Sequence, residues 1–149
     1  LQPLLRADEL AALHAGHPLL AKPRLQPRDF EAAWFVSLAP TDPYRRAVDV
    51  MFAEAGVQRQ MVLDAASAVS VCALVRQGLG LAIVNPLTAL EMAGPDLHIR
   101  PLSVSIPFHV GLVTPELRPP NPLLPALVAS LQKAAAEVRA RLHAASRGR

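Results

Sequence analysis

Six residues placed after three apolar runs could together bind a small charged ligand. The runs lie at 34–38, 61–63 and 79–84 and have the composition and length of strands. The residues that follow them are Thr41, Asp42, Tyr44, Ala66, Ser67 and Asn85. Ligands of α/β sheets bind at the carboxyl ends of the strands, so this pattern predicts a binding site along one sheet edge.

The residue types at these positions suit a ligand that carries a carboxylate. Helices are predicted to begin at Tyr44 and just after Ser67, where free backbone N–H groups and the helix dipole attract negative charge. Asp42 could pair with an ammonium or guanidinium group of the same ligand. The alternative for Asp42 and Ser67 is plain helix N-capping, and the alternative for Tyr44 is packing in the core.

The segment 58–86 organises the elements around these positions. It reads as a strand at 61–63, a polar turn at 64–67, a helix, a stop at Gly78 and a second strand at 79–84. Four apolar residues of the helix recur on one face: Ala68, Val71, Cys72 and Val75. Strands that alternate with a helix of this length predict a βαβ unit in a mostly parallel sheet.

The remaining chain predicts further elements of an α/β fold. Before the central segment we expect a strand at 9–13, a helical turn at 27–33, a strand at 34–38 and a helix at 44–55, and we leave 1–6 unassigned. The core face of helix 44–55 would carry Tyr44, Val48, Met51, Phe52 and Ala55, and its solvent face Arg45, Arg46, Asp49 and Glu54. After the segment we expect a helix at 86–92, strands at 97–102 and 107–113, and a long helix. The long helix follows the proline-rich stretch 118–125 and ends near Leu142, with an apolar stripe of Leu124, Val128, Leu131, Ala135, Val138 and Leu142.

Composition and charge limit the classes of function. The 149 residues are 52% hydrophobic and 18% charged, which indicates a folded chain with a core. The net charge of +3 arises at the end of the chain, from Arg139, Arg141, Arg147 and Arg149. Without them 11 basic residues face 12 acidic ones, so we expect no nucleic-acid-binding face. We also expect no membrane span and no signal peptide, since charged residues interrupt the N-terminal apolar stretch at Arg6, Asp8 and Glu9.

Motifs for catalysis or cofactor binding are absent from the sequence. The single cysteine, Cys72, lies on a predicted apolar face and reads as a buried, inert thiol. The five histidines, at 14, 17, 98, 109 and 143, show no metal-ligand spacing. The sequence contains no P-loop, no G-x-G-x-x-G and no G-x-S-x-G. We therefore expect no metal, no cofactor and no enzymatic activity.

Five segments, in order, resemble the LysR-type transcriptional regulators. They are HAGHPLL at 14–20, RRAVDVMFAEAGV at 45–57, LVRQGLGLAIVNP at 74–86, PFHVGLVTP at 107–115 and the final helix. The resemblance covers almost the whole chain. SLAPTDPYRR at 37–46 and AIVNPLTAL at 82–90 resemble most the opine- and amino-acid-responsive branch, such as the regulators of octopine and nopaline catabolism.

The resemblance implies a fold and a function. The fold would be an α/β, periplasmic-binding-protein type II-like effector domain with two lobes, of which this chain holds the second completely and the first in part. Residues 1–24 would be the crossover and part of the first lobe, 25–86 the second lobe, and 87–149 its end and the return to the first lobe. The chain would be cytoplasmic, bind a small anionic or zwitterionic effector with the six residues above, and form a homodimer or homotetramer through helix 44–55. DNA would be contacted only by a helix-turn-helix domain that this chain lacks.

Three other classes of function remain open on the sequence. An exported solute-binding protein would share the fold. A small hydrolase could use Ser67 or Ser70 with a histidine, although nothing supplies a base at a defined spacing. A stand-alone DNA-binding protein is disfavoured because the excess of basic residues is confined to the end of the chain.

Overall fold

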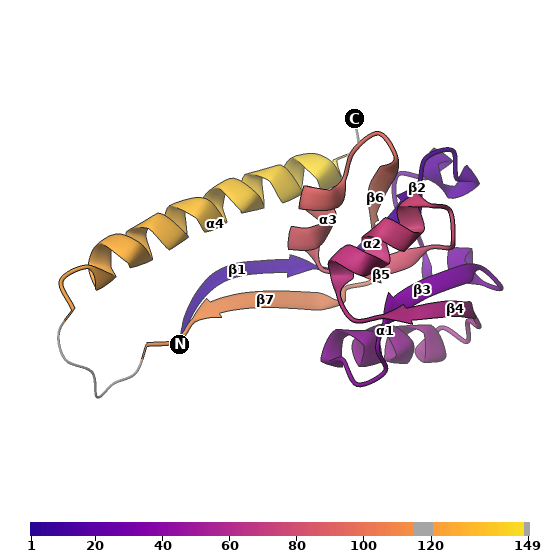
Figure 1. Ribbon diagram of the computed structural model, residues 1–149, viewed down its shortest axis with the longest axis horizontal. Helices are drawn as coiled ribbons and strands as arrows, with labels where there is room; N and C mark the ends of the chain where they lie inside the picture. The colour runs from indigo at the N-terminus through magenta and orange to yellow at the C-terminus, as the bar shows by residue number, and fades with distance from the viewer. Residues whose placement is uncertain (115–120, 148–149) are drawn as a thin grey trace.

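The protein is an α/β body with an extended arm, as its computed structural model shows (Figure 1). The structure describes residues 1–114 and 121–147. The strands are β1 (Gln2–Asp8), β2 (Leu10–His14), β3 (Trp34–Leu38), β4 (Gln60–Ala65), β5 (Ala82–Val84), β6 (Leu97–Pro101) and β7 (Pro107–Leu112). The helices are α1 (Pro43–Glu54), α2 (Ala68–Arg76), α3 (Pro86–Met92) and α4 (Leu124–Ser146), with 3-10 turns η1 (Pro18–Ala21) and η2 (Pro27–Phe30). The arm consists of the antiparallel pair β1–β7 with α4 beside it.

The sheet of the body is mixed, which corrects the predicted mostly parallel sheet. Strand β3 pairs in parallel with β4, whereas β2 pairs antiparallel with both β5 and β6. A parallel bridge between Phe35 and Leu81 joins these two groups into the row β4-β3-β5-β2-β6. The prediction was wrong because β2 enters the sheet from the arm and lies between β5 and β6. In addition, β4 and β5 are separated by β3, so the crossover through α2 passes over one strand.

The bridge between β3 and β5 depends on Gly80. The backbone N–H of Val36 donates to Leu81 O, and the N–H of Leu81 donates to Trp34 O, both at 2.8 Å. Gly80 has φ +156°, and a Cβ placed there would lie 2.7 Å from Trp34 O. Only glycine fits this close backbone approach. The regular strand therefore begins at Ala82, later than the predicted start at residue 79.

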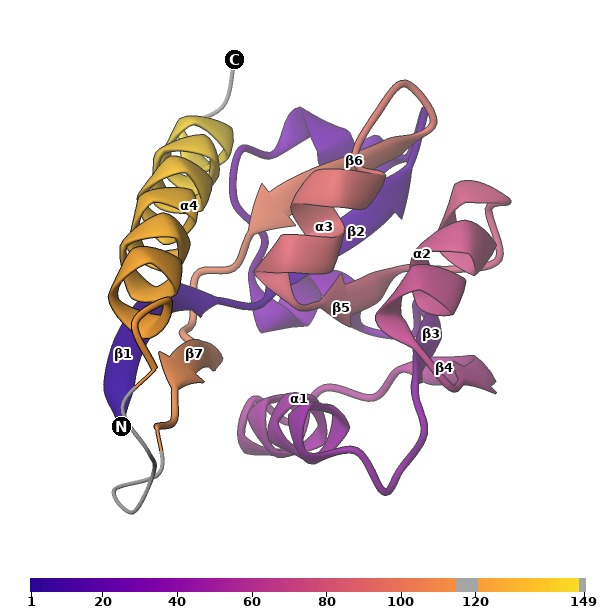
Figure 2. The ribbon, with the colours of Figure 1, turned by 60° about the vertical axis from the view of Figure 1, so that its left-hand side comes forward.

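Each face of the sheet covers its own apolar core (Figure 2). Helix α2 packs on one face through Val71, Cys72 and Val75, the residues predicted for its buried side. Helix α1 packs on the other face, where the rings of Phe30, Phe35 and Phe52 meet edge to face with centroids 5.3–6.0 Å apart. Such aromatic contacts add to the free energy gained from apolar burial. Cys72 is buried as predicted, and burial raises the pKa of its thiol to about 11.

Among the boundaries that differ from the predictions, three reflect the long-range pairing of strands. The segment 1–6, left unassigned, belongs mostly to β1, in which residues 2–8 pair with β7. The strand predicted at 9–13 begins at Leu10 and runs to His14. The predicted polar turn at 64–67 begins two residues late, since Asp64 and Ala65 pair with β3 and belong to β4.

Helix α4 carries the predicted apolar stripe. Its six residues are the least exposed positions of the first five turns, and Leu142 is buried in the core shared by α2 and β5. Part of the proline-rich stretch expected before this helix, residues 118–120, lies outside the described residues, as does Arg149. No described helix is long and apolar enough to cross a membrane.

Replacing Gly80 with alanine should destabilise the protein by about 2 kcal/mol or more, because the new methyl group meets backbone atoms that cannot move aside. Gly94→Ala is the matched control, since a Cβ there meets nothing within 4 Å. Its unfolding free energy should stay within about 0.5 kcal/mol of the wild type. Urea denaturation measures both values, and equal stability of the two variants would contradict this account of the bridge.

Candidate functional site

Three of the predicted site residues, Asp42, Ser67 and Asn85, cap helices. Oδ1 of Asp42 accepts hydrogen bonds from the N–H groups of Tyr44 (2.8 Å) and Arg45 (3.2 Å). Oγ of Ser67 accepts from Ser70 N at 3.2 Å. Oδ1 of Asn85 accepts from Thr88 N at 2.9 Å. N-capping, the alternative weighed for Asp42 and Ser67, is therefore what the structure shows, and it leaves the other oxygen of Asp42 outside the cap.

The strand order brings these caps to one edge of the sheet. Strands β4, β3 and β5 are neighbours, and each is followed by one of the capped helices. Thr41 and Ala66 are exposed beside the caps. Tyr44 is half-buried against Phe108 of β7, with ring centroids 5.5 Å apart, so the ring contributes to the core. Three helix N-termini therefore lie along the edge that the sequence predicts as the binding site.

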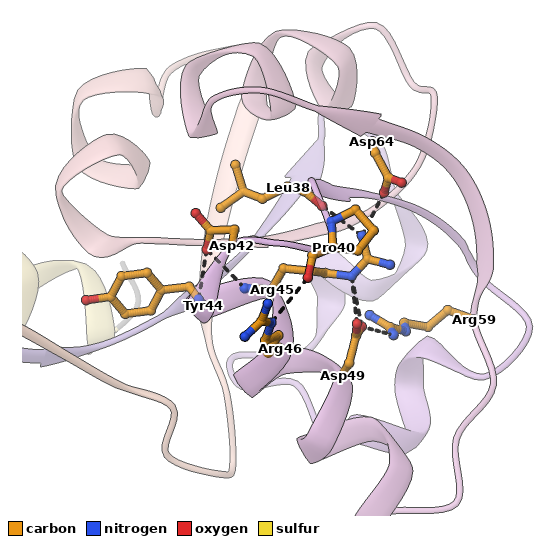
Figure 3. Close-up of polar contacts among 9 residues, drawn as sticks. All are labelled: Leu38, Pro40, Asp42, Tyr44, Arg45, Arg46, Asp49, Arg59 and Asp64. Carbon is orange, nitrogen blue, oxygen red and sulfur yellow. Dashed lines mark hydrogen bonds and ion pairs between the residues drawn. The ribbon is translucent and has the colours of Figure 1, made fainter.

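Arg45 holds two strand ends and α1 together, although it was predicted on the solvent face. Its Nη1 donates to Leu38 O and to Asp64 Oδ1, both at 2.7 Å, and its Nε donates to Asp49 Oδ2 at 2.9 Å (Figure 3). The side chain is buried because these acceptors replace water around the guanidinium. Its spacing from Val48 and Phe52, three and seven residues on, is that of the core face and could have indicated this burial.

The charge of Arg45 is stabilised by its partners. Burial alone would lower its pKa, but its hydrogen bonds to Asp64 and Asp49, together with the negative charges of these two residues, outweigh burial and raise the pKa of Arg45. Asp49 also accepts from Arg59 Nη2 at 2.5 Å, and the Arg59 guanidinium stacks 4.2 Å from the centroid of the Phe52 ring. This network holds the strand ends in place. The guanidinium groups of Arg45 and Arg59 form ion pairs with protein carboxylates.

Glu9 is a buried carboxylic acid at the same edge, and sequence reasoning missed it. It lies between β1 and β2, where the chain passes from the arm to the body, and its side chain is 2% exposed. Its Oε1 has no hydrogen-bond partner among the described residues. Leu10, the next residue, pairs with Val84, so Glu9 lies beside Asn85 where the strands end. The signal available in the sequence was an acidic residue directly before a short apolar run.

The side chain of Glu9 faces the α1 side of the sheet. Ala11 and Leu13 belong to the core under α1, whereas Leu10 and Ala12 belong to the core under α2. Alternation along the strand therefore places Glu9 toward the start of α1, where Asp42 lies. Burial, and next the negative charge of Asp42, raise the pKa of Glu9 from 4.5 to about 8.

Several hollows open on the described surface. One, of about 890 Å³, lies between α3, β6 and the end of α4, and it contains His98 and His143. A hollow of about 260 Å³ lies where the chain passes from β1 to β2, between this passage and the end of α4. It includes Glu9, Arg24 and Arg139. The caps Asp42, Ser67 and Asn85 line neither hollow.

Nothing in the described residues assembles a hydrolytic or metal site. Oγ of Ser67 contacts Oγ of Ser70 at 3.0 Å, and the hydrogen bonds of these hydroxyls in the described part of the chain do not involve a histidine. Within residues 1–114 and 121–147 there is no group of three or more His, Cys, Asp or Glu side chains that could hold a metal ion.

Comparison with known proteins identifies the family. Residues 1–136 match the family described as the LysR substrate binding domain. The chain belongs to this family. It is 45% identical to the transcriptional activator protein LysR of Escherichia coli K12. The alignment covers 129 residues, which are 87% of this chain and 42% of that protein. It is 29% identical to the regulatory protein NocR of Agrobacterium tumefaciens T37. The alignment covers 119 residues, which are 80% of this chain and 40% of that protein.

Solved LysR-family domains have the same fold. The regulatory domain of Synechocystis CcmR in complex with 2-PG has a TM-score of 0.72 at 17% identity, over 90% of this chain and 65% of that one. The effector binding domain of QuiR in complex with shikimate has a TM-score of 0.65 at 15% identity. The match covers 91% of this chain and 65% of that one. The predicted fold class, a periplasmic-binding-protein type II-like domain present in part, is confirmed. The chain spans less than half of the curated LysR and NocR proteins that it matches.

Replacing Glu9 with glutamine should change how stability depends on pH. Above about pH 4.5 the unfolded chain loses the Glu9 proton while the folded protein retains it up to about pH 8, so wild-type stability falls as pH rises between these values. The loss is on the order of 5 kcal/mol at most. In Glu9→Gln this contribution is absent, and denaturation at about pH 5 and about pH 8.5 should show the variant gaining stability over the wild type only at the higher pH.

The matched control for this experiment is Glu54→Gln, which replaces an exposed carboxylate on α1. Its stability should follow the wild type within about 0.5 kcal/mol at both pH values. A wild-type protein whose stability relative to Glu9→Gln stays constant over this range would show that Glu9 is ionised in the folded state.

Proposed function

We propose that this chain is the ligand-sensing part of a LysR-type transcriptional regulator, and that its effector is a small anionic or zwitterionic metabolite such as an amino acid or an opine. The observation that carries the proposal is the row of three helix N-termini at one sheet edge in a chain of this family. The dipoles of these helices attract a ligand carboxylate, and because the first N–H groups of α1 donate to Asp42, backbone hydrogen bonds to the ligand would come from α2 and α3. The effector residues would be those predicted: Thr41, Asp42, Tyr44, Ala66, Ser67 and Asn85.

Two further parts of the proposal concern the rest of the protein. The similarity to the LysR activator supports DNA contact through a helix-turn-helix domain outside this chain and action in the cytoplasm, without an enzymatic activity. The lobes would divide at residues 24 and 86 as predicted. Effector binding would change transcription only to the extent that the effector binds one arrangement of the lobes more tightly than the other.

An exported solute-binding protein of the same fold is the remaining candidate. It is disfavoured because the family match and both curated relatives are transcription regulators or regulatory proteins.

The proposed dimer would use α1 and the adjacent edge of the sheet. In the described part of the chain β4 pairs only with β3, and its residues Met61, Val62 and Leu63 are 39–45% exposed. Val50 on α1 is also exposed, and the Arg45–Asp64 ion pair links α1 to β4. An exposed apolar strand with a free edge is covered in soluble proteins more often than left open. This surface therefore supports the proposal that a second copy packs here.

Ligand binding tests the effector proposal. Isothermal titration of the full-length protein with octopine, nopaline, L-arginine and L-ornithine should give saturable heat with at least one of them. Asp42→Asn should weaken that binding about tenfold or more, because asparagine caps α1 equally well but lacks the negative charge that pairs with an ammonium group. Asp96→Asn, an exposed change after α3, should leave affinity unchanged. A folded protein that gives no heat with any of the four compounds would remove the opine and amino-acid hypothesis.

The dimer is tested by a charge placed on its proposed surface. Leu63→Glu should raise the dissociation constant of the dimer about tenfold or more, since a carboxylate would be buried between two apolar surfaces. Val104→Glu is the control, because Val104 is similarly exposed in the segment after β6, at the opposite edge of the sheet. Sedimentation equilibrium gives both constants, and equal weakening by the two changes, or by neither, would place the interface elsewhere.

A further inference from the structure

We propose that Glu9, together with the oxygen of Asp42 that does not cap α1, binds a cationic nitrogen of the effector, an ammonium or guanidinium group. This inference rests on the proposed function of this sheet edge and names the ligand class more narrowly: the effector must carry a positively charged nitrogen, and a purely anionic metabolite would not satisfy the site.

The first support is the unfilled hydrogen-bonding capacity of Glu9. A carboxyl oxygen buried without a partner is costly, so buried polar atoms are rarely left in this state without a reason. Of the buried polar side chains Glu9, Ser37 and Arg45, the guanidinium of Arg45 is held by Asp49, Asp64 and Leu38 O. Oε1 of Glu9, by contrast, has no partner among the described residues. A hydrogen-bond donor of the ligand would supply the partner that Oε1 of Glu9 lacks.

The second support is the position of Glu9 relative to Asp42. Strand register places Glu9 beside Asn85, and strand alternation turns its side chain toward the start of α1. Figure 3 shows Asp42 at that start, with one oxygen directed at the α1 backbone and the other directed away from it. Two neighbouring carboxyl groups repel each other when both are ionised, and a bound cation removes this repulsion.

The cations of the surrounding protein do not fill this role. Arg45 and Arg59 are both paired with Asp49, although Nη1 of Arg59 is buried without a partner among the described residues. The charged groups that share the hollow on the arm side of Glu9 are Arg6, Asp8, Arg24, Arg139 and His143. Arg24 and Arg139 donate to the backbone carbonyls of Leu102 and Leu4. After burial, the charge of Asp42 is the main influence on the pKa of Glu9 among the described residues.

Binding of a cation would remove a proton from Glu9. Before binding, the raised pKa keeps the carboxyl protonated near neutral pH. When an ammonium donates to it, the carboxylate form is favoured, the O–H bond breaks, and the proton passes to the buffer. The carboxylate that remains is neutralised by the ligand cation. Ligand binding should therefore release up to one proton per site near pH 7, which a merely structural role of Glu9 would not do.

Titration calorimetry of the full-length protein in two buffers of different ionisation enthalpy measures this proton. The probes are L-ornithine and L-arginine, with glutarate as an anion that has no cationic nitrogen. We expect the wild type to bind at least one amino acid with proton release. Glu9→Gln should bind it about tenfold or more weakly and release no proton, whereas Glu9→Asp should restore proton release. Asp8→Asn changes the adjacent carboxylate, which accepts from Ser105, and should leave affinity and proton release unchanged.

Each result decides between the two proposals. Wild-type binding of an amino acid with equal affinity and equal proton release in Glu9→Gln would overturn the role of Glu9 while leaving the effector site in place. Binding of glutarate alone would overturn the cationic ligand class but support an anionic effector. Binding of none of the three probes by a folded protein would count against both.

Discussion

The close approach of the Gly80 backbone to Trp34 determines where the candidate site can form. The two hydrogen bonds between Leu81 and β3 are the link that sets β5 beside β3, and they require a residue without a Cβ at position 80. Without this link, β5 and Asn85 would have no fixed position relative to α1. With it, the starts of α1, α2 and α3 lie along one edge. The site therefore follows from a single backbone contact more than from any one functional side chain.

Arg45 makes the same edge rigid from within. Its bonds to Leu38 O and Asp64 hold the ends of β3 and β4 at fixed distances from α1. Charge-assisted hydrogen bonds of a planar guanidinium are directional, so they fix orientation as well as distance. Because Asp49 and Asp64 compensate Arg45, this cation is not available to attract a ligand carboxylate. Because the first N–H groups of α1 already donate to Asp42, recognition of an anion by backbone N–H groups at this edge would fall to the starts of α2 and α3.

The local features of the site could be predicted from the sequence, whereas the long-range ones could not. Asp42, Ser67 and Asn85 stand next to strong strand and helix patterns, and capping is a local interaction, so their positions were predictable. The burial of Arg45 depends on Asp64, nineteen residues away in the chain. The burial of Glu9 depends on the passage between arm and body and on the return segment at Ile106. The mixed sheet was missed for the same reason, because neither β1 nor the placement of β2 has a local signal.

The position of Glu9 connects recognition to the geometry of the chain. Its backbone N–H donates to Ile106 O at 2.9 Å, so the two segments that pass between arm and body are joined at this residue. Its side chain faces α1, which belongs to the body alone. A ligand held by Glu9 and Asp42 would therefore contact both the crossing and the body, and its affinity would depend on how the arm is oriented. Such a difference in affinity between orientations is the physical requirement for a sensor, since a ligand that binds all orientations equally shifts none of them.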